Sequence, residues 1–266
     1  SSAPGSTAAT LVATPTQTLS NITSTGISVT IGTATNSSAA QYSIQFGDSY
    51  VQANGTLAGG QIWQTAAVWG APVNVTGLTP STSYTIQIIA KNPDGSTSNG
   101  TSTGTTEYTL ANVPTAPTVT AVSSTSINAV INENSNPAAT EFSIQIGSNY
   151  VQANGTLNTT QVWQTKAAWG GSSGVAITGL SANTAYAVGV IARNINPTPS
   201  VTAASSTTIR YTQVNAPTMT MSSVTTNGAT LTIGENSNPA ETTYAIAFTI
   251  NTVTRVAADS PAIATP

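Results

Sequence analysis

The sequence predicts an all-β protein built from tandem β-sandwiches, and three observations support this prediction. Apolar and polar residues alternate with a period of two in segments such as 26–32, 42–46 and 83–90, as expected of half-buried strands. Threonine, valine and isoleucine, which favour strands, dominate these segments. No segment carries a long apolar stripe with the period of a helix.

Long segments of the chain repeat one another. Residues 42–70 and 142–170 align without gaps and are identical at 19 of 29 positions. A third copy begins at 233–248, which matches 131–146. Units of about 100 residues are long enough to bury their own cores. We therefore expect a lead-in at 1–9, domains at 10–110 and 111–212, and a partial third domain at 213–266.

Proline marks the boundaries between these units. Residues 112–117 read NVPTAP and residues 214–218 read VNAPT. Such short segments act as semi-rigid spacers, so we expect an extended row of sandwiches. The third unit reaches Pro266 without the second half that the other units contain. We expect the natural chain to continue past Pro266; the alternative is completion by strands of a neighbouring subunit, through β-augmentation.

Charged residues are scarce and exclude some classes of partner. Only 5% of residues are Asp, Glu, Lys or Arg, against about 25% in an ordinary domain. The net charge of −3 provides no field that attracts nucleic acid or anionic lipid. The apolar runs are too short to span a bilayer. We expect no nucleic acid partner and no membrane span.

Two segments resemble a known family. Residues 75–98 read VTGLTPSTSYTIQIIAKNPDGSTS, and residues 177–194 read ITGLSANTAYAVGVIARN. Both resemble the later half of the fibronectin type III repeat, and the variant with YVQ, NGTL and WQT is similar to repeats of bacterial surface and secreted proteins. The resemblance implies immunoglobulin-like sandwiches of two sheets, used as spacers, adhesive modules or assembly modules. It implies no catalytic activity.

All four tryptophans lie in the repeated segment. The family usually has a core tryptophan on its second strand, where this chain has isoleucine. If residues 63–69 form one strand, Trp63 and Trp69 share a face, and the exchange of Ala66 for Lys166 indicates that the opposite face is wet. We predict that the tryptophans fill the core; the alternative is an exposed platform for sugars. The expected core residues are Trp63, Trp69, Trp163, Trp169, Tyr84, Tyr186, Leu78 and Leu180.

Catalysis and metal binding are not expected. The chain has no His and no Cys, the commonest catalytic bases and nucleophiles, and the spacing of its eight carboxylates suggests no catalytic pair. Residues 132–136 (NENSN) and 234–238 (GENSN) offer oxygen ligands for Ca²⁺, but one carboxylate in each is few. We interpret them as turns in which Asn and Ser bond to their own backbone. We expect no cofactor.

Seven N-x-Ser/Thr sequons occur, about the number that chance gives in a chain so rich in Ser and Thr. Glycosylation at these positions depends on the machinery of the host. The candidate sites are Asn21, Asn36, Asn54, Asn74, Asn99, Asn154 and Asn158.

The scarcity of charge also bears on function. Sheet edges are normally protected by charged residues, and the chain has five Lys and Arg in all. We predict a non-enzymatic, extracellular or cell-surface structural protein that assembles with itself into a filament, sheath or surface layer. One alternative is a spacer or adhesion region of a larger secreted enzyme or adhesin. Another is a carbohydrate-binding module that uses the tryptophan pairs to bind surface glycans.

Overall fold

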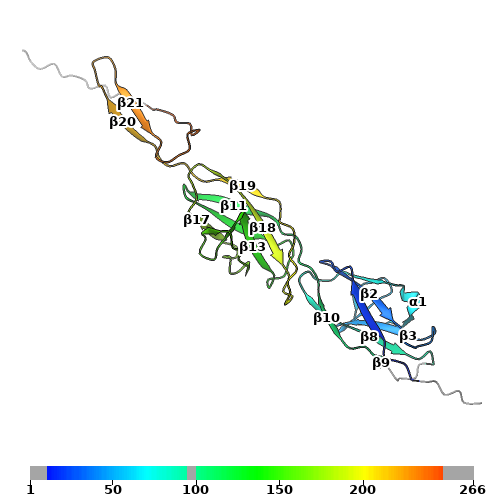
Figure 1. The fold of residues 1–266 in the computed structure, drawn as a ribbon. Helices are drawn as coiled ribbons and strands as arrows, with labels where there is room; N and C mark the ends of the chain where they lie inside the picture. The colour runs from blue at the N-terminus through cyan, green and yellow to red at the C-terminus, as the bar shows by residue number, and fades with distance from the viewer. Residues whose placement is uncertain (1–10, 95–99, 248–266) are drawn as a thin grey trace, which may run out of the picture.

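The computed structural model describes residues 11–94 and 100–247. Apart from one helical turn, the regular structure of this part of the chain is β-strand. The three units follow one another in an extended row, with the N-terminal unit at one end and the third unit at the other (Figure 1). No helix in the described residues is long and apolar enough to cross a membrane.

The first unit is a sandwich of two antiparallel sheets. Its elements are β1 (Thr16–Ser20), β2 (Gly26–Gly32), β3 (Gln41–Phe46), β4 (Ser49–Val51), β5 (Leu57–Ala58), β6 (Gln64–Thr65), α1 (Ala66–Trp69), β7 (Val73–Thr76), β8 (Ser83–Lys91), β9 (Gly100–Thr101) and β10 (Thr105–Tyr108). One sheet has the order β1-β2-β7 and the other the order β10-β8-β3-β4-β5. The short strands β6 and β9 pair with β3 and β8.

The second unit repeats this architecture. Its strands are β11 (Thr115–Ser123), β12 (Ser126–Asn132), β13 (Glu141–Ile146), β14 (Asn149–Val151), β15 (Leu157–Asn158), β16 (Gln164–Thr165), β17 (Val175–Thr178), β18 (Ala185–Arg193) and β19 (Thr208–Tyr211). The sheets have the orders β11-β12-β17 and β15-β14-β13-β18-β19, with β16 paired to β13. Each strand therefore occupies the place of its counterpart in the first unit.

The alternation seen in the sequence places the same residue types in both cores. Strands β3 and β13 have identical burial patterns, with Ile44 and Ile144 fully buried at their centres. Each of the first two units has its own cluster of buried apolar side chains between its two sheets. Burying a side chain of this size contributes about 1.5–3 kcal/mol, so each of these two units has a core of its own.

The Gly-Leu-to-Tyr segment forms the corner that leads into β8 and β18. Leu78 and Leu180 are buried in the two cores, as expected. Tyr84 and Tyr186 are half-buried and pack against the core margin. The Tyr84 hydroxyl accepts a hydrogen bond from the backbone N–H five residues upstream at 2.9 Å, and the Tyr186 hydroxyl does the same. Each tyrosine thus fixes the corner of its sandwich.

The described part of the third unit is an open hairpin. Strands β20 (Thr218–Ser222) and β21 (Thr230–Gly234) pair in register as a two-stranded sheet. Met219 and Met221 are 59% and 58% exposed. Ile246, at the position of the fully buried Ile44 and Ile144, is 46% exposed. In the first two units, the sheet that contains β3 or β13 packs over the hairpin that corresponds to β20 and β21.

Candidate functional site

The tryptophan segment is not a single strand, and this part of the prediction is wrong. In the first unit β6 ends at Thr65 and α1 follows, with Gly70 after its last residue. The Thr65 hydroxyl accepts a hydrogen bond from the Val68 N–H at 3.4 Å, as an N-cap does. In the second unit turns replace the helical turn. Because the chain forms a helical turn or other turns here, the side chains over 63–69 do not point alternately to two faces as they would in a strand.

Trp69 and Trp169 lie in the cores, as expected, with exposed fractions of 7% and 2%. Each indole Nε1 donates a 2.8 Å hydrogen bond to a backbone carbonyl, that of Tyr42 or of Phe142. A buried indole N–H needs such a partner. These tryptophans therefore tie the end of the repeated segment to β3 and β13.

Trp63 and Trp163 lie outside both core clusters and are half-buried, so the prediction that they fill the core is wrong. The Lys91 Nζ lies 4.4 Å from the ring centroid of Trp63, and the Arg193 guanidinium carbon lies 4.8 Å from that of Trp163. Both distances are typical of cation–π contacts. A sugar that stacks on this ring face would first have to displace the cation.

Four of the five charged residues of the second unit form two ion pairs beside this segment. The Arg193 Nε donates to the Glu141 Oε2 at 2.6 Å, and the Lys166 Nζ lies 3.0 Å from the Glu133 Oε2. In the first unit, Gln41 occupies the position of Glu141. The charge of Lys166 is therefore paired with a carboxylate, and both side chains are partly exposed.

The two ENSN segments, residues 133–136 and 235–238, bind the linkers that lead into their own units. The Asn136 Oδ1 accepts from the Asn112 N–H at 2.7 Å, and the Asn136 Nδ2 donates to the Asn112 and Glu133 carbonyls at 2.8 and 2.7 Å. The side-chain amide thus acts as a peptide unit paired with the linker, in addition to closing its own turn. Asn238 makes the equivalent bonds with Asn215 and Glu235. We call this arrangement the asparagine clamp.

A second set of bonds reinforces the clamp where one described unit follows another. The Asn112 Nδ2 donates to the Asn134 carbonyl at 3.0 Å, and the Asn134 Nδ2 donates to the Val113 carbonyl at 2.8 Å. Asn215 and Asn236 repeat this pair of side chains. In the first unit both positions are alanine, Ala13 and Ala34, and only the bonds between Asn36 and the Ala13 backbone are present. Sequence reasoning found the turn and missed the clamp.

Further hydrogen bonds cross each joint. Asn194, which is 1% exposed, donates through Nδ2 to the Thr109 carbonyl of the first unit at 3.1 Å. Asn183 donates to the Thr242 hydroxyl of the third unit at 2.9 Å. Because buried amides are costly when unpaired, these contacts favour one relative orientation of neighbouring units.

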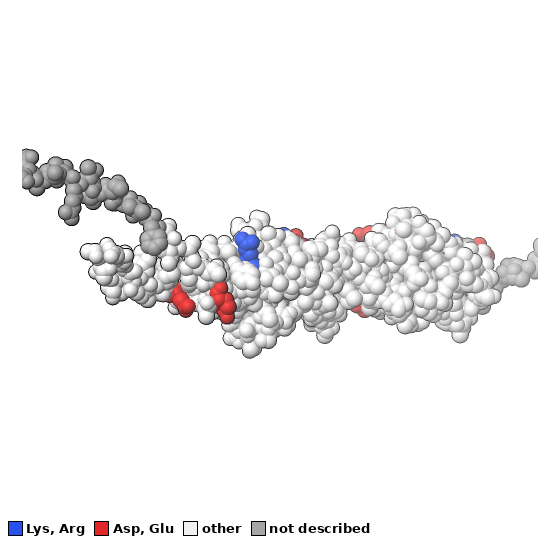
Figure 2. All heavy atoms as spheres, turned by 90° about the horizontal axis from the view of Figure 1, so that it is seen from above, with Lys and Arg blue, Asp and Glu red and all other residues white. Residues whose placement is uncertain are grey.

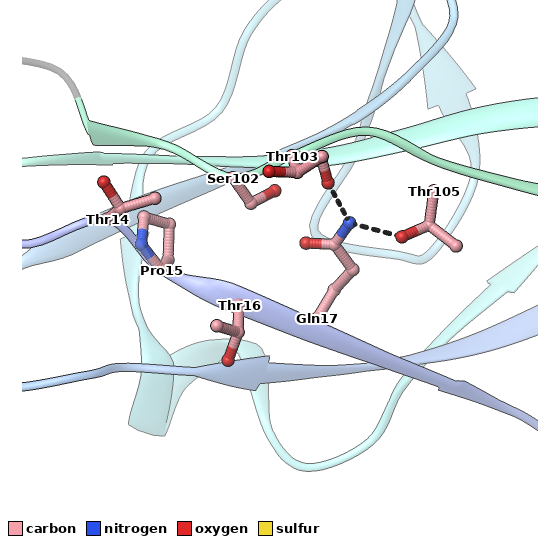
Figure 3. A pocket seen from close by; sticks show the side chains of 7 residues that line it. All are labelled: Thr14, Pro15, Thr16, Gln17, Ser102, Thr103 and Thr105. Atoms are coloured by element: carbon pink, nitrogen blue, oxygen red, sulfur yellow. Dashed lines mark hydrogen bonds between the residues drawn. The ribbon is translucent and has the colours of Figure 1, made fainter.

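The surface hollow in Figure 3 is lined by polar groups that are partly engaged in hydrogen bonds within the domain. The hollow in Figure 3 lies between the start of β1 and the chain around Thr103. Gln17 Nε2 points across it and donates to the Thr103 carbonyl at 2.7 Å and the Thr105 hydroxyl at 2.9 Å. Its amide hydrogens are therefore already engaged. Within the described ranges, no group of three or more acidic side chains is placed to hold a metal ion.

Comparison with known families assigns the first unit. A model of the fibronectin type III domain matches residues 13–106. These residues form a fibronectin type III domain. The second unit has the same strand order, so the chain contains two sandwiches of this topology in tandem. Domains of this family are in general non-catalytic scaffold or adhesion modules of an extracellular type.

Solved structures similar to the chain are also arrays of such domains. A segment of two fibronectin type III domains from chicken tenascin is 16% identical, with a TM-score of 0.46, covering 74% of this chain and 98% of that chain. The FN1–FN3 domains of chicken CNTN1 are 15% identical, with a TM-score of 0.30, covering 76% and 68%. A comparison with curated proteins gives no match.

Proposed function

We propose that this chain is a non-enzymatic structural subunit outside the cell, which assembles with copies of itself into a filament, sheath or surface layer. The observation that carries the proposal is the scarcity of charge on the described edge strands. Edge strands β1, β5, β7, β11, β15 and β17 and both strands of the third unit contain no charged residue, and edge strands β10 and β19 contain one each, Glu107 and Arg210. Charged side chains are a usual protection against pairing between edges.

The few cations do little to keep copies apart. Of the four Lys and Arg in the described residues, Lys91, Lys166 and Arg193 are held against tryptophan rings or carboxylates of their own domains, and Arg210 is exposed on edge strand β19. Figure 2 shows a face on which charged side chains are few and scattered. Repulsion between like charges is therefore weak, and hydroxyl and amide groups dominate the contacts available to a second copy.

The two joints support the same proposal. Each joint combines an asparagine clamp with a hydrogen bond between side chains or to the backbone of the neighbouring unit. A subunit with a defined shape loses less conformational entropy when it enters a regular polymer than a flexible string of domains does. Repeated, stiff joints thus suit a polymer subunit.

Electron microscopy and light scattering of the purified chain test this proposal. We expect regular polymers that persist between about 0.01 and 1 M salt, where the Debye length falls from about 30 to about 3 Å. A variant with a charge on edge strand β1, T18K, should assemble less. Its matched control is T85K, which adds the same charge on β8, a strand with neighbours on both sides. Single beaded molecules at every concentration would instead support the spacer alternative.

A further inference from the structure

The structure sorts the sequons, because their side chains have different surroundings. Six of the seven lie in the described residues, and Asn99 lies outside them. A folded acceptor needs an exposed amide nitrogen that no other contact occupies. Its hydroxyl partner two residues on also needs to be close enough to bond with the side-chain carbonyl. These two criteria separate Asn54 and Asn154 from the other four described sequons.

Asn54 lies at the tip of the β4–β5 hairpin, in a turn that its hydrogen bonds and Gly55 hold in one conformation. The Gly55 N–H donates to the Gln52 carbonyl at 2.9 Å, and Gly55 has a φ of +81°. A Cβ on Gly55 would lie 2.3 Å from the Asn74 carbonyl oxygen, so only glycine fits. The Thr76 N–H donates to the Gly55 carbonyl at 2.9 Å, which pins the tip to the opposite sheet.

This turn positions the acceptor groups of the sequon. The Asn54 Oδ1 accepts from the Thr56 N–H at 3.1 Å and from the Thr56 hydroxyl at 2.8 Å. Asn154 and Thr156 repeat both bonds at the same distances. Two donors on the carbonyl oxygen polarise the amide and favour loss of a proton from its nitrogen during attack. Among the described residues no partner occupies the Nδ2 of either asparagine, and both residues are exposed.

The other described sequons lack this arrangement. Both ends of the Asn36 amide are held by the Ala13 backbone. The Asn74 Oδ1 accepts from the Ser28 hydroxyl, and the Asn21 Nδ2 donates to that hydroxyl. The Asn158 Oδ1 accepts from the hydroxyl of the next residue and from a backbone N–H two residues on, without the hydroxyl bond of the Asn54 type.

We propose that Asn54 and Asn154 are acceptors of N-linked glycans, transferred from a lipid-linked diphosphate sugar. The Nδ2 attacks the anomeric carbon, the carbon–nitrogen bond forms, and the carbon–oxygen bond to the diphosphate breaks. The diphosphate leaves with the electron pair, and the amide nitrogen loses one proton to a base of the transferase. The inference rests on the extracellular location in the proposed function, and not on assembly.

The test uses the folded 266-residue chain, a single-subunit oligosaccharyltransferase that accepts N-x-Ser/Thr, and a dolichol-linked diphosphate sugar. A proteolytic digest of the same chain, in which every sequon is unfolded, measures the intrinsic preference of the enzyme. Mass spectrometry then maps the glycan on each asparagine. We expect Asn54 and Asn154 of the folded chain to react at least about tenfold faster than Asn74 and Asn158, a barrier difference of about 1.4 kcal/mol, and this preference to disappear in the digest.

Two results would overturn the inference. One is equal modification of Asn74 or Asn158 in the folded chain, and the other is no reaction at Asn54 and Asn154 in the folded chain when the digest reacts. A T56S variant, which keeps the hydroxyl, should retain modification of Asn54. In a folded N54Q/N154Q variant, Asn74 and Asn158 should react no faster than they do in the folded wild-type chain. Whether this variant still polymerises is scored separately, so loss of assembly and loss of glycosylation are distinguishable.

Discussion

The first two domains share a core and differ at its margin. Both bury a tryptophan that donates to the backbone of the facing strand, through Trp69 and Trp169. At the margin, the first domain has Gln41 beside Lys91, whereas the second has Glu141 paired with Arg193. The comparison teaches that the apolar pattern and one buried hydrogen bond define the domain. The ion pairs are additions that one copy tolerates and the other lacks.

The largest effect expected is that of truncating the buried tryptophans. W69A and W169A should each lower the free energy of unfolding of their own domain by about 3–5 kcal/mol, because each leaves a cavity and an unpaired carbonyl. W63A and W163A should cost about 1 kcal/mol, the worth of an exposed cation–π contact. Denaturant unfolding with hydrogen exchange resolved by domain measures all four. A W63A cost equal to that of W69A would contradict the separation into core and margin.

An intermediate effect is expected at the joint. N136A leaves the Asn112 N–H and carbonyl without their partners, which should cost about 1–3 kcal/mol of local stability. Hydrogen exchange at residues 109–115 should rise, while exchange in β3 and β8 of the first domain stays unchanged. N36A is the matched control, since it breaks the equivalent bonds where no described domain precedes. Small-angle scattering measures the range of orientations between the first two domains. If this range is the same for N136A and wild type, the clamp does not stiffen the joint and does not support the proposal of assembly.

Strand pattern and repeat length sufficed to predict the sandwiches, because both are local properties of the chain. The same pattern misled at 63–69, where alternate positions look like a strand although α1 forms. Thr65 before AAVW and Gly70 after it are helix start and stop signals, and they identify the turn better than the alternation does.

The asparagine clamp lay beyond sequence reasoning for a different reason. Its bonds join residues more than 20 positions apart, and asparagine is common throughout this chain. The repeated asparagines at 112 and 215, each ahead of an ENSN segment, were the signal available. Only the geometry shows that these side chains replace a strand partner for the linker. The cation–π contacts of Trp63 and Trp163 could not be predicted for the same reason. Their cations lie on β8 and β18, which are distant from the tryptophans in the sequence.

The smallest effect expected is that of removing a charge that distinguishes the two domains. E141Q gives the second domain the residue that the first has at this position, and it leaves Arg193 stacked on Trp163. Because Glu141 and Arg193 are partly exposed, with side chains 33% and 27% accessible, the loss should be about 0–1 kcal/mol. The difference from wild type should shrink further near 1 M salt, where the Debye length is about 3 Å. Denaturant unfolding of both proteins at low and high salt measures it. A loss above about 2 kcal/mol that persists in high salt would show that the pair supports the second domain's core. The two domains would then differ in what holds them together, and not only at their margins.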